Sequence, residues 1–147
     1  MKDPRKDKVG YADMVGDLLH WGHVEFLRNC KQVCEYLVVG VDSDELVTEH
    51  KRKPVIPFEK RIDVIRAIRY VDEARDSLSW NPADMMKILV SEGYNLKYYF
   101  HGNDRIDSRA VDYIRSIGGE AVVTPYVEGI STTYIITRIM ERQDEKK

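Results

Sequence analysis

The segment Tyr36–Val41, with the sequence YLVVGV, is the feature that most constrains the fold of this 147-residue chain. The run is nearly all apolar and rich in β-branched residues, which favours a strand. A strand that faced water on one side would alternate apolar with polar residues, so the run predicts a strand buried on both faces of a parallel sheet. Residues 97–100 and 120–124 show the same character, and residues 9–12 predict a further short strand.

Five helical patterns lie between and after these predicted strands. They cover residues 24–33, 57–68, 82–91, 108–117 and 132–140. The second pattern begins with proline, which is common at a helix start, and two glycines follow the fourth pattern as a stop before the next strand. Alternation of strands and helices predicts an α/β fold, with a parallel sheet covered by helices on both faces.

The length and charge of the chain limit the classes of function. A chain of 147 residues fits a single domain, which we place at residues 9–141 between flexible tails at 1–8 and 142–147. The formal net charge is -2 with acidic and basic residues interspersed, which argues against a nucleic-acid surface. Apolar runs stay short of the roughly 18 residues that cross a membrane, and the start lacks a signal-peptide core. We therefore expect a cytoplasmic protein without membrane insertion.

The segment MVGDLLHWGH, residues 14–23, lies between the first predicted strand and the helix that follows. Ligands of open α/β sheets gather at the carboxyl ends of strands, and exposed N–H groups at a helix start attract phosphate. Neutral imidazoles of His20 and His23 can donate hydrogen bonds to phosphate oxygens, and Gly22 would let a phosphate approach the backbone. The segment therefore predicts an anion site built on a histidine pair.

Two other interpretations of the histidine pair stay open. His20 and His23 could share a metal ion, but Cys30 lies seven residues past His23, about 10 Å along a helix, and is too far away to be a third ligand. Alternatively, one histidine packs and the other is solvated. Cys30 and Cys34 are the only cysteines, and we expect them simply to pack. We predict no metal ion held by protein side chains alone.

A second helix start follows in EGISTTYIITRI, residues 128–139. Ser131 is a plausible N-cap, and at Thr132 and Thr133 side-chain hydroxyls and backbone N–H groups both point outward. Alone the segment is an ordinary capped helix. Together with the histidine segment it provides two helix N-termini that could face one polyphosphate.

Three further segments carry candidate ligand groups. HKRKP, residues 50–54, is the only dense basic cluster inside the domain, and Lys51 or Lys53 in it could reach a phosphate. HGND, residues 101–104, follows a predicted strand, and Asp104 could accept from a ribose hydroxyl or cap the next helix. Trp80 could hold a cation or an apolar edge of a substrate.

Five segments, in this order, resemble the cytidylyltransferase family of nucleotidyltransferases. They are HWGH (20–23), YLVVGVDSDEL (36–46), RAIRYVDE (66–73), HGND (101–104) and YVEGISTT (126–133), and the likeness covers residues 9–139. The resemblance implies a Rossmann-like fold, a homodimer, and an enzyme of the EC 2.7.7 type. It also implies transfer of CMP from CTP to a phosphorylated small alcohol, with release of pyrophosphate and help from nucleotide-bound Mg²⁺.

The same resemblance implies a role for each matched residue. His20, His23 and Lys51 would be catalytic: the histidines would contact the CTP phosphates, and Lys51 would bridge nucleotide and acceptor phosphates. The nucleotide would be bound by Val15, Gly16, Gly22, Lys53, Gly102, Asp104, Gly129, Ile130, Ser131, Thr132 and Thr133. The acceptor would be bound by Asp17, Arg61, Arg69 and Trp80.

The chain departs from the family pattern at three places. Where many members read G-x-F-D before the first histidine, this chain has Met14 and Gly16 at the glycine and aromatic positions. Gly16 would then have to supply the flexibility of the turn. Tyr126 replaces an arginine, which removes a charge that could pair with phosphate, and Asn103 replaces an aspartate.

The acceptor and the nucleotide stay open between alternatives. Glycerol 3-phosphate, phosphoethanolamine and phosphocholine are all acceptors within the resemblance, and Trp80 with Asp17 would favour a cationic alcohol. A transferase that uses ATP on a sugar phosphate is a second reading. A nucleotide-binding protein with little catalysis is a third.

Overall fold

The computed structural model describes residues 1–102, 106–125, 127 and 129–145. Five parallel strands form one sheet in the order β3-β2-β1-β4-β5. Their bounds are β1 (Val9–Met14), β2 (Tyr36–Asp42), β3 (Glu73–Ser77), β4 (Leu96–His101) and β5 (Glu120–Val123). Because β2 and β4 lie on either side of β1, the winding of the chain reverses at β1, and ligands of such sheets bind at the carboxyl ends beside that reversal.

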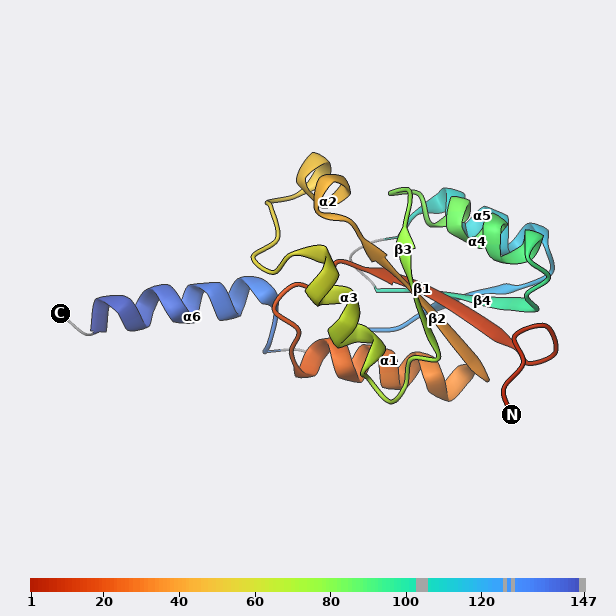
Figure 1. Ribbon diagram of the computed structural model, residues 1–147, viewed down its shortest axis with the longest axis horizontal. Helices are drawn as coiled ribbons and strands as arrows, with labels where there is room; N and C mark the ends of the chain where they lie inside the picture. The colour runs from red at the N-terminus through yellow and green to blue at the C-terminus, as the bar shows by residue number, and fades with distance from the viewer. Residues whose placement is uncertain (103–105, 126, 128, 146–147) are drawn as a thin grey trace.

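The described residues form six helices besides the sheet. Their bounds are α1 (Trp21–Val33), α2 (Asp44–His50), α3 (Phe58–Arg66), α4 (Pro82–Ser91), α5 (Ser108–Ser116) and α6 (Thr132–Glu145). Helices α1 and α3 pack on one face of the sheet, and α4 and α5 pack on the other (Figure 1). The predicted α/β class, with a parallel sheet and helices on both faces, is confirmed.

Alternate residues of β2 enter the two hydrophobic cores. Leu37, Val39 and Val41 belong to the core beneath α1 and α3, whereas Val38 belongs to the core beneath α4 and α5. Residues 37–42 are all buried. The unbroken apolar run of this strand therefore reflects burial on both faces, as predicted.

Two elements are absent from the sequence prediction. Strand β3 has the polar sequence EARDS and lies at an edge of the sheet, where it pairs only with β2, so it lacks the apolar run of the inner strands. Helix α2 has seven residues and begins at Asp44, with Ser43 as its N-cap: the Ser43 hydroxyl accepts from the backbone N–H of Leu46. A helix this short gives little periodicity to read.

Contacts and helical structure extend into both segments expected as tails. Asn95 donates from its backbone N–H to the carbonyl of Pro4 (2.8 Å) and from its side chain to the carbonyl of Lys6 (3.1 Å). Lys2 pairs with Asp72 at 2.6 Å. The flexibility expected of residues 1–8 stays a prediction. Residues 142–145, expected in the C-terminal tail, are helical and continue α6.

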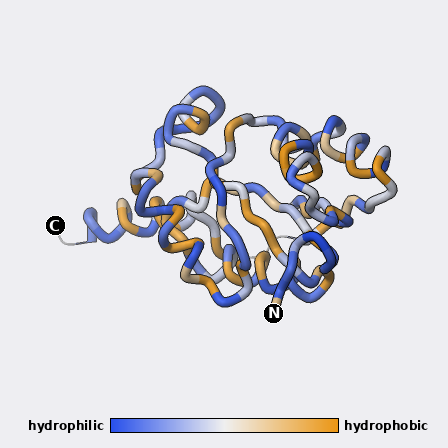
Figure 2. The backbone as a smooth tube through the Cα atoms, turned by 45° about the vertical axis from the view of Figure 1, so that its right-hand side comes forward, coloured by the Kyte–Doolittle hydropathy of each residue, from blue (hydrophilic) through white to orange (hydrophobic). Residues whose placement is uncertain are grey.

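Helix α6 projects away from the body of the protein (Figure 1). None of its described residues is buried, and Tyr134, Ile139 and Met140 are exposed apolar side chains. Figure 2 shows hydrophobic and hydrophilic residues along the whole length of this helix. Within the described part of the chain, no helix is long and apolar enough to span a membrane.

Candidate active site

A pocket of about 1090 Å³ lies at the carboxyl ends of β1 and β4. It is built from the turn after β1, the start of α1, the loop after α2 and the start of α6. Most of the predicted site residues line it, namely Val15, Gly16, Asp17, His20, Gly22, His23, Lys51, Gly102, Gly129, Ile130, Ser131, Thr132 and Thr133. The two predicted helix starts therefore meet at one pocket.

His20 and His23 cap the first turn of α1 for each other. Nδ1 of His20 accepts a hydrogen bond from the backbone N–H of Gly22 (3.0 Å), and Nδ1 of His23 accepts from the backbone N–H of His20 (3.1 Å). The two rings lie 4.0 Å apart between centroids. Helix α1 therefore begins at Trp21, three residues earlier than the apolar pattern predicts, because His20 satisfies its first donors.

The capping bonds decide which nitrogen of each ring carries the proton. A nitrogen that accepts a backbone N–H has no proton of its own, so a neutral ring carries its proton on Nε2. Burial lowers the pKa of His23 to about 4, helped by the neighbouring ring of His20, and burial also lowers the pKa of His20. Both side chains are therefore neutral at pH 7 and offer an Nε2–H donor in the pocket.

Gly22 is required by the cap itself. A Cβ at Gly22 would lie 2.8 Å from Cε1 and 3.0 Å from Nδ1 of His20, and 3.3 Å from Cγ2 of Ile130. We predicted that Gly22 admits a phosphate to the backbone, but the nearest group at this point is the folded-back ring of His20. The contact with Ile130 also brings the second helix start against the first.

The turn after β1 takes a left-handed conformation at two residues. Gly16 has φ +70° and Leu18 has φ 48°, a value that is uncommon for a leucine. Met14 packs largely into the core beneath α1 and α3, with 9% of its surface exposed. Gly16 thus supplies the flexibility that the family pattern obtains from a glycine two positions earlier.

The second helix start is tied to the first through its hydroxyls. Ser131 Oγ accepts from the backbone N–H of Tyr134 (3.0 Å), which confirms Ser131 as the N-cap of α6. Thr132 Oγ1 donates to the backbone carbonyl of Asp17 (3.0 Å), so its hydroxyl proton is used inside the protein. An anion at this start would therefore meet the backbone N–H of Thr132 rather than its hydroxyl proton.

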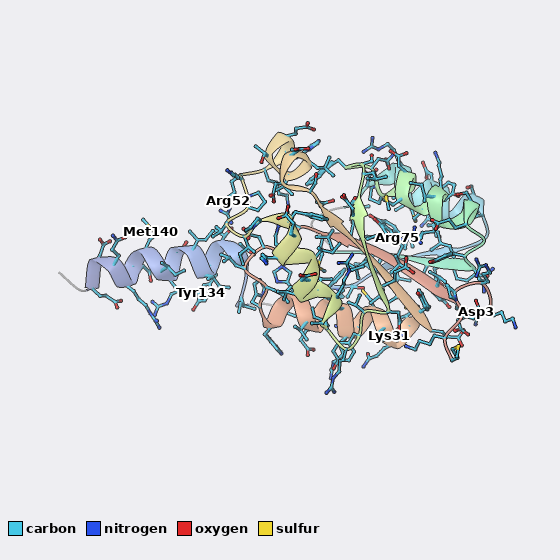
Figure 3. All side chains as sticks on the ribbon, in the orientation of Figure 1. Asp3, Lys31, Arg52, Arg75, Tyr134 and Met140 are labelled. Atoms are coloured by element: carbon cyan, nitrogen blue, oxygen red, sulfur yellow. The ribbon has the colours of Figure 1, made fainter. Side chains whose placement is uncertain are left out.

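The basic loop after α2 presents a different pair of cations than predicted. Lys51 lines the pocket as expected, but the second cation that lines it is Arg52, and Lys53 does not. Figure 3 labels Arg52 near the start of α6. One of its guanidinium nitrogens donates to Thr133 Oγ1 over 3.2 Å. The arginine thus bridges the basic loop and the start of α6.

Asp17 holds the basic loop against the turn. Its two carboxylate oxygens accept from the backbone N–H groups of Val55 (2.9 Å) and Ile56 (3.0 Å), and 7% of the residue is exposed. The expected contact between Asp17 and the acceptor stays a prediction, but these bonds give the carboxylate a structural partner on each oxygen.

Arg61 and Arg69 are not among the residues that line the pocket, and the acceptor contacts expected of them stay a prediction. The side chain of Arg61 has no exposed surface; it donates to the carbonyls of Val15 and Ile56 and pairs with Asp44 at 2.7 Å. Arg69 is exposed and precedes the amino end of β3, whereas the pocket lies at the carboxyl ends of β1 and β4. A helical pattern alone does not show at which end of the sheet a side chain lies.

Trp80 does not line the pocket, although it lies next to Lys51, which does. Its indole stacks on the imidazole of His50, with centroids 4.3 Å apart and planes 3° from parallel. Lys51 Nζ lies 5.9 Å from the centre of the same indole. The carboxyl ends of β2 and β3, which precede these residues, place them side by side.

Several lining residues escape the sequence prediction. They are chiefly apolar or buried in the strands, and they comprise Asp13, Met14, Phe26, Val47, Pro54, Tyr99, Phe100, His101, Val127 and Tyr134 besides Arg52. The position of Asp13 and His101 at the ends of β1 and β4 is the signal that would have found them. Asp104, Asn103 and Tyr126 lie outside the described residues.

The two cysteines pack as predicted. Cys30 and Cys34 are free thiols, buried in the core beneath α1, and burial raises the pKa of Cys34 to about 11. No group of three or more His, Cys, Asp or Glu side chains gathers into a metal site among the residues that the structure covers.

The fold and this pocket define an α/β domain whose helix starts, histidine donors and cations suit a polyphosphate. Residues 16–138 match the family model described as cytidylyltransferase-like. The chain belongs to this family.

Two curated relatives and one solved structure illustrate the similarity. A glycerol-3-phosphate cytidylyltransferase of Bacillus subtilis (strain 168) is 34% identical over 119 residues, covering 81% of this chain and 87% of the relative. An ethanolamine-phosphate cytidylyltransferase of Arabidopsis thaliana is 32% identical over 140 residues, 92% of this chain, which spans only 33% of that relative. A lipopolysaccharide core biosynthesis protein from Thermoplasma volcanium GSS1 shares the fold, with a TM-score of 0.66 at 24% identity, over 82% of this chain and 97% of that one.

Proposed function

We propose that this protein transfers CMP from CTP to a phosphorylated small alcohol, giving a CDP-alcohol and pyrophosphate. The single observation that carries the proposal is the reciprocal cap of His20 and His23, because it leaves two Nε2–H donors in a pocket that a second helix start also lines. Membership of the cytidylyltransferase-like family supports the same reaction.

The reaction needs positioning and charge neutralisation rather than a covalent intermediate. A phosphate oxygen of the acceptor attacks the α-phosphorus of CTP and forms a new P–O bond. The bond from that phosphorus to the oxygen that bridges to the β-phosphorus breaks, and its electron pair leaves with pyrophosphate. His20 and His23 donate Nε2–H to phosphate oxygens, where negative charge develops in the transition state.

The cations and the second helix start bind the remaining phosphate charge. The backbone N–H groups at the start of α6 face the terminal phosphates, as helix N-termini do for anions. Lys51, which lines the pocket from the opposite loop, bridges the nucleotide and the attacking acceptor phosphate. The positive charge of Lys51 then offsets the repulsion between the nucleotide phosphates and the acceptor phosphate as they approach each other.

Mg²⁺ fits this site as a companion of the nucleotide. Mg²⁺ prefers phosphate oxygens and water, with few protein carboxylates, and the described lining of the pocket contains two carboxylates, Asp13 and Asp17, beside the donors and cations that suit the phosphates. When bound, the ion would neutralise charge on the triphosphate. The protein residues orient the phosphates around it.

The proposal is tested by a screen for pyrophosphate release. CTP and ATP are each combined with glycerol 3-phosphate, phosphoethanolamine, phosphocholine and a heptose 1-phosphate. Release with CTP and one of the alcohol phosphates is expected. Release only with ATP and the heptose phosphate would support the adenylyltransferase instead, and tight nucleotide binding without release in any well would support a binding protein.

The homodimer and the cytoplasmic location are proposals that accompany the function. The exposed apolar residues Tyr134, Ile139 and Met140 of α6 support self-association, because burial of exposed apolar side chains against a partner is favourable. Light scattering of the purified chain measures the mass directly, and a monomer at all concentrations would exclude the dimer.

A further inference from the structure

Three segments that contribute to the pocket wall meet at Asp17. They are the turn after β1 (residues 15–20), the basic loop (residues 51–56) and the start of α6 (residues 131–133). The proposed function uses groups from all three segments on phosphate. Because the segments lie far apart in the sequence, the geometry of the site depends on the contacts that join them.

The carboxylate of Asp17 anchors the basic loop. One oxygen accepts from the backbone N–H of Val55 (2.9 Å) and the other from that of Ile56 (3.0 Å), and the residue is 7% exposed. Two charge-assisted bonds from consecutive N–H groups fix both the position and the direction of the loop. Lys51 and Arg52 therefore line the pocket from a loop whose far end is held in place.

The backbone carbonyl of Asp17 holds the start of α6. It accepts from Oγ1 of Thr132 over 3.0 Å, a contact between residues 115 positions apart. Helix α6 projects from the body and none of its described residues is buried, so burial contributes little to placing its first turn (Figure 1). Asp17 thus joins the loop that carries the cations to the helix start that the proposed function assigns to the terminal phosphates.

Arg52 ties the loop to α6 directly. Its guanidinium donates to Thr133 Oγ1 over 3.2 Å, and both residues are exposed. A terminal phosphate in the pocket would compete for the guanidinium, so a bound nucleotide weakens this contact. The bonds of Asp17 involve neither side chain and can persist beside a bound phosphate.

The charge of Asp17 has little effect on His23 at neutral pH. Burial and the ring of His20 lower the pKa of His23 to about 4, although the Asp17 carboxylate opposes them. The ring is therefore neutral at pH 7 with or without that carboxylate charge. A neutral replacement of Asp17 at pH 7 thus changes the hydrogen bonds of the loop and not the protonation of His23.

Given the proposed function, we propose that Asp17 is a positioning residue that fixes Lys51 and Arg52 relative to the start of α6. Lys51 then meets the acceptor phosphate, and Arg52 the terminal phosphates, in the geometry that an in-line displacement needs. Asp17 acts through these two side chains and is not itself in contact with the reacting atoms. This role differs from the acceptor contact that the family resemblance implies for Asp17.

Hydrogen exchange tests the anchoring without any turnover. In Asp17→Asn, one carboxylate oxygen becomes an NH2 group, which faces a backbone N–H and cannot accept its bond. The amides of Val55 and Ile56 are expected to exchange roughly tenfold faster than in the intact chain. Arg61 still joins the turn to the loop through the carbonyls of Val15 and Ile56, so the variant folds.

Asp107→Asn is the matched control for this measurement. Asp107 also accepts a backbone N–H, from Arg109 (3.0 Å), but it caps α5 and does not line the pocket. The control is expected to leave the activity and the exchange of Val55 and Ile56 unchanged. Unchanged exchange in Asp17→Asn as well would overturn the inference.

A double-mutant cycle tests whether the anchoring acts through Lys51. Asp17→Asn is expected to lower kcat/KM for the acceptor, measured as pyrophosphate release from CTP, roughly 100-fold. In Lys51→Met the same change is expected to cost less than about threefold further, because the side chain that the loop positions is gone. A direct acceptor contact of Asp17 would persist in Lys51→Met, so equal losses in both backgrounds would overturn the positioning role.

Thr132→Val tests the tie to α6 while Asp17 itself is kept. Valine has the shape of threonine without the hydroxyl, so the bond to the Asp17 carbonyl is lost. KM for CTP is expected to rise roughly tenfold, whereas exchange at Val55 and Ile56 stays unchanged. An unchanged KM would overturn the coupling of Asp17 to α6.

Failure of the inference is distinguishable from failure of the transferase function. The positioning role fails on the exchange and double-mutant results above while the intact chain still releases pyrophosphate. No release by the intact chain with CTP and any of the phosphorylated alcohols overturns the transferase function, on which the inference rests. The exchange result then still shows whether Asp17 anchors the loop.

Discussion

The backbone N–H of His20 donates to Nδ1 of His23 over 3.1 Å, while Nδ1 of His20 accepts from the N–H of Gly22 over 3.0 Å. Each histidine thus has two separate tasks. Its Nδ1 completes the first turn of α1, and its Nε2 is left as a donor in the pocket. The two tasks can be separated by substitution, because asparagine carries an oxygen near the position of Nδ1 but has nothing at the position of Nε2.

His20→Asn is expected to abolish most activity while leaving stability intact. Asparagine is among the best N-cap residues, so the bond to Gly22 persists and the free energy of unfolding changes by less than about 0.5 kcal/mol. Loss of one donor to the transition state lowers kcat roughly 100-fold or more. The readouts are pyrophosphate release and urea unfolding.

His20→Ala is the matched comparison, since it removes both the donor and the cap. It should lose the same activity and about 1 kcal/mol of stability in addition. Full activity in His20→Asn would mean that the ring serves only as a cap, and the transferase mechanism would then lack its main donor.

The stability of the fold should depend on pH through His23. The ordinary histidine pKa is 6.5, and burial lowers the pKa of His23 in the folded protein to about 4. A lowered histidine pKa favours the folded state when the ring is neutral, so this stabilisation is complete above pH 6.5 and is lost as the pH falls toward 4. The loss amounts to about 2 kcal/mol at pH 5.

His23→Asn isolates this contribution. The asparagine oxygen can accept the N–H of His20 but does not titrate, so the difference in unfolding free energy between the two proteins should change between pH 7 and pH 5. Other titrating groups are common to both chains and cancel. If the unfolding free energies of the two proteins changed equally between pH 7 and pH 5, this result would contradict a buried, neutral His23.

The inner strands of the sheet and the start of α6 were predictable because each depends on neighbouring residues. The apolar run of β2 and the Ser131 cap of α6 are written in a few consecutive residues. Strand β3 was not predictable, because an edge strand tolerates polar residues and its partner β2 lies more than thirty positions away. Local sequence patterns thus predict the layers of the fold but not the edge strand β3.

The direction of each side chain at the site depends on distant contacts. Asp17 bonds to the N–H groups of Val55 and Ile56, 38 and 39 positions away, and these bonds set the path of the basic loop. That path turns Arg52 into the pocket and leaves Lys53 out of it. Nothing in the sequence alone indicates which of these adjacent basic residues enters the pocket.

Arg52→Gln is expected to weaken nucleotide binding. The guanidinium uses one nitrogen on Thr133 Oγ1 at the start of α6 and has further N–H groups for the terminal phosphates. Loss of a charge-assisted contact raises KM for CTP roughly tenfold, with a smaller effect on KM for the acceptor. Initial rates measured at varied CTP concentration and at varied acceptor concentration give the two KM values separately.

Arg115→Gln is the control, since Arg115 is exposed on α5 and does not line the pocket. It removes the same charge and should leave both KM values unchanged. Should Arg52→Gln alter only KM for the acceptor, Arg52 would belong to the acceptor phosphate and not to the nucleotide.

Arg61→Met is expected to destabilise the protein without changing its affinity for the acceptor. Methionine fills much of the same buried volume but leaves the carbonyls of Val15 and Ile56 without their donor and Asp44 without its ion pair. The free energy of unfolding should fall by roughly 2–4 kcal/mol. Urea unfolding measures the loss, and KM for the acceptor is measured at low temperature, where the variant stays folded.

Arg69→Met provides the contrast, because Arg69 is exposed before the amino end of β3 and does not line the pocket. It should change stability by less than about 0.5 kcal/mol and leave KM for the acceptor unaltered. The family resemblance implies acceptor contacts for both arginines. A rise in acceptor KM in Arg61→Met, with stability retained, would favour that role over the structural one, because a side chain that holds Val15, Ile56 and Asp44 together cannot be removed without cost to the fold.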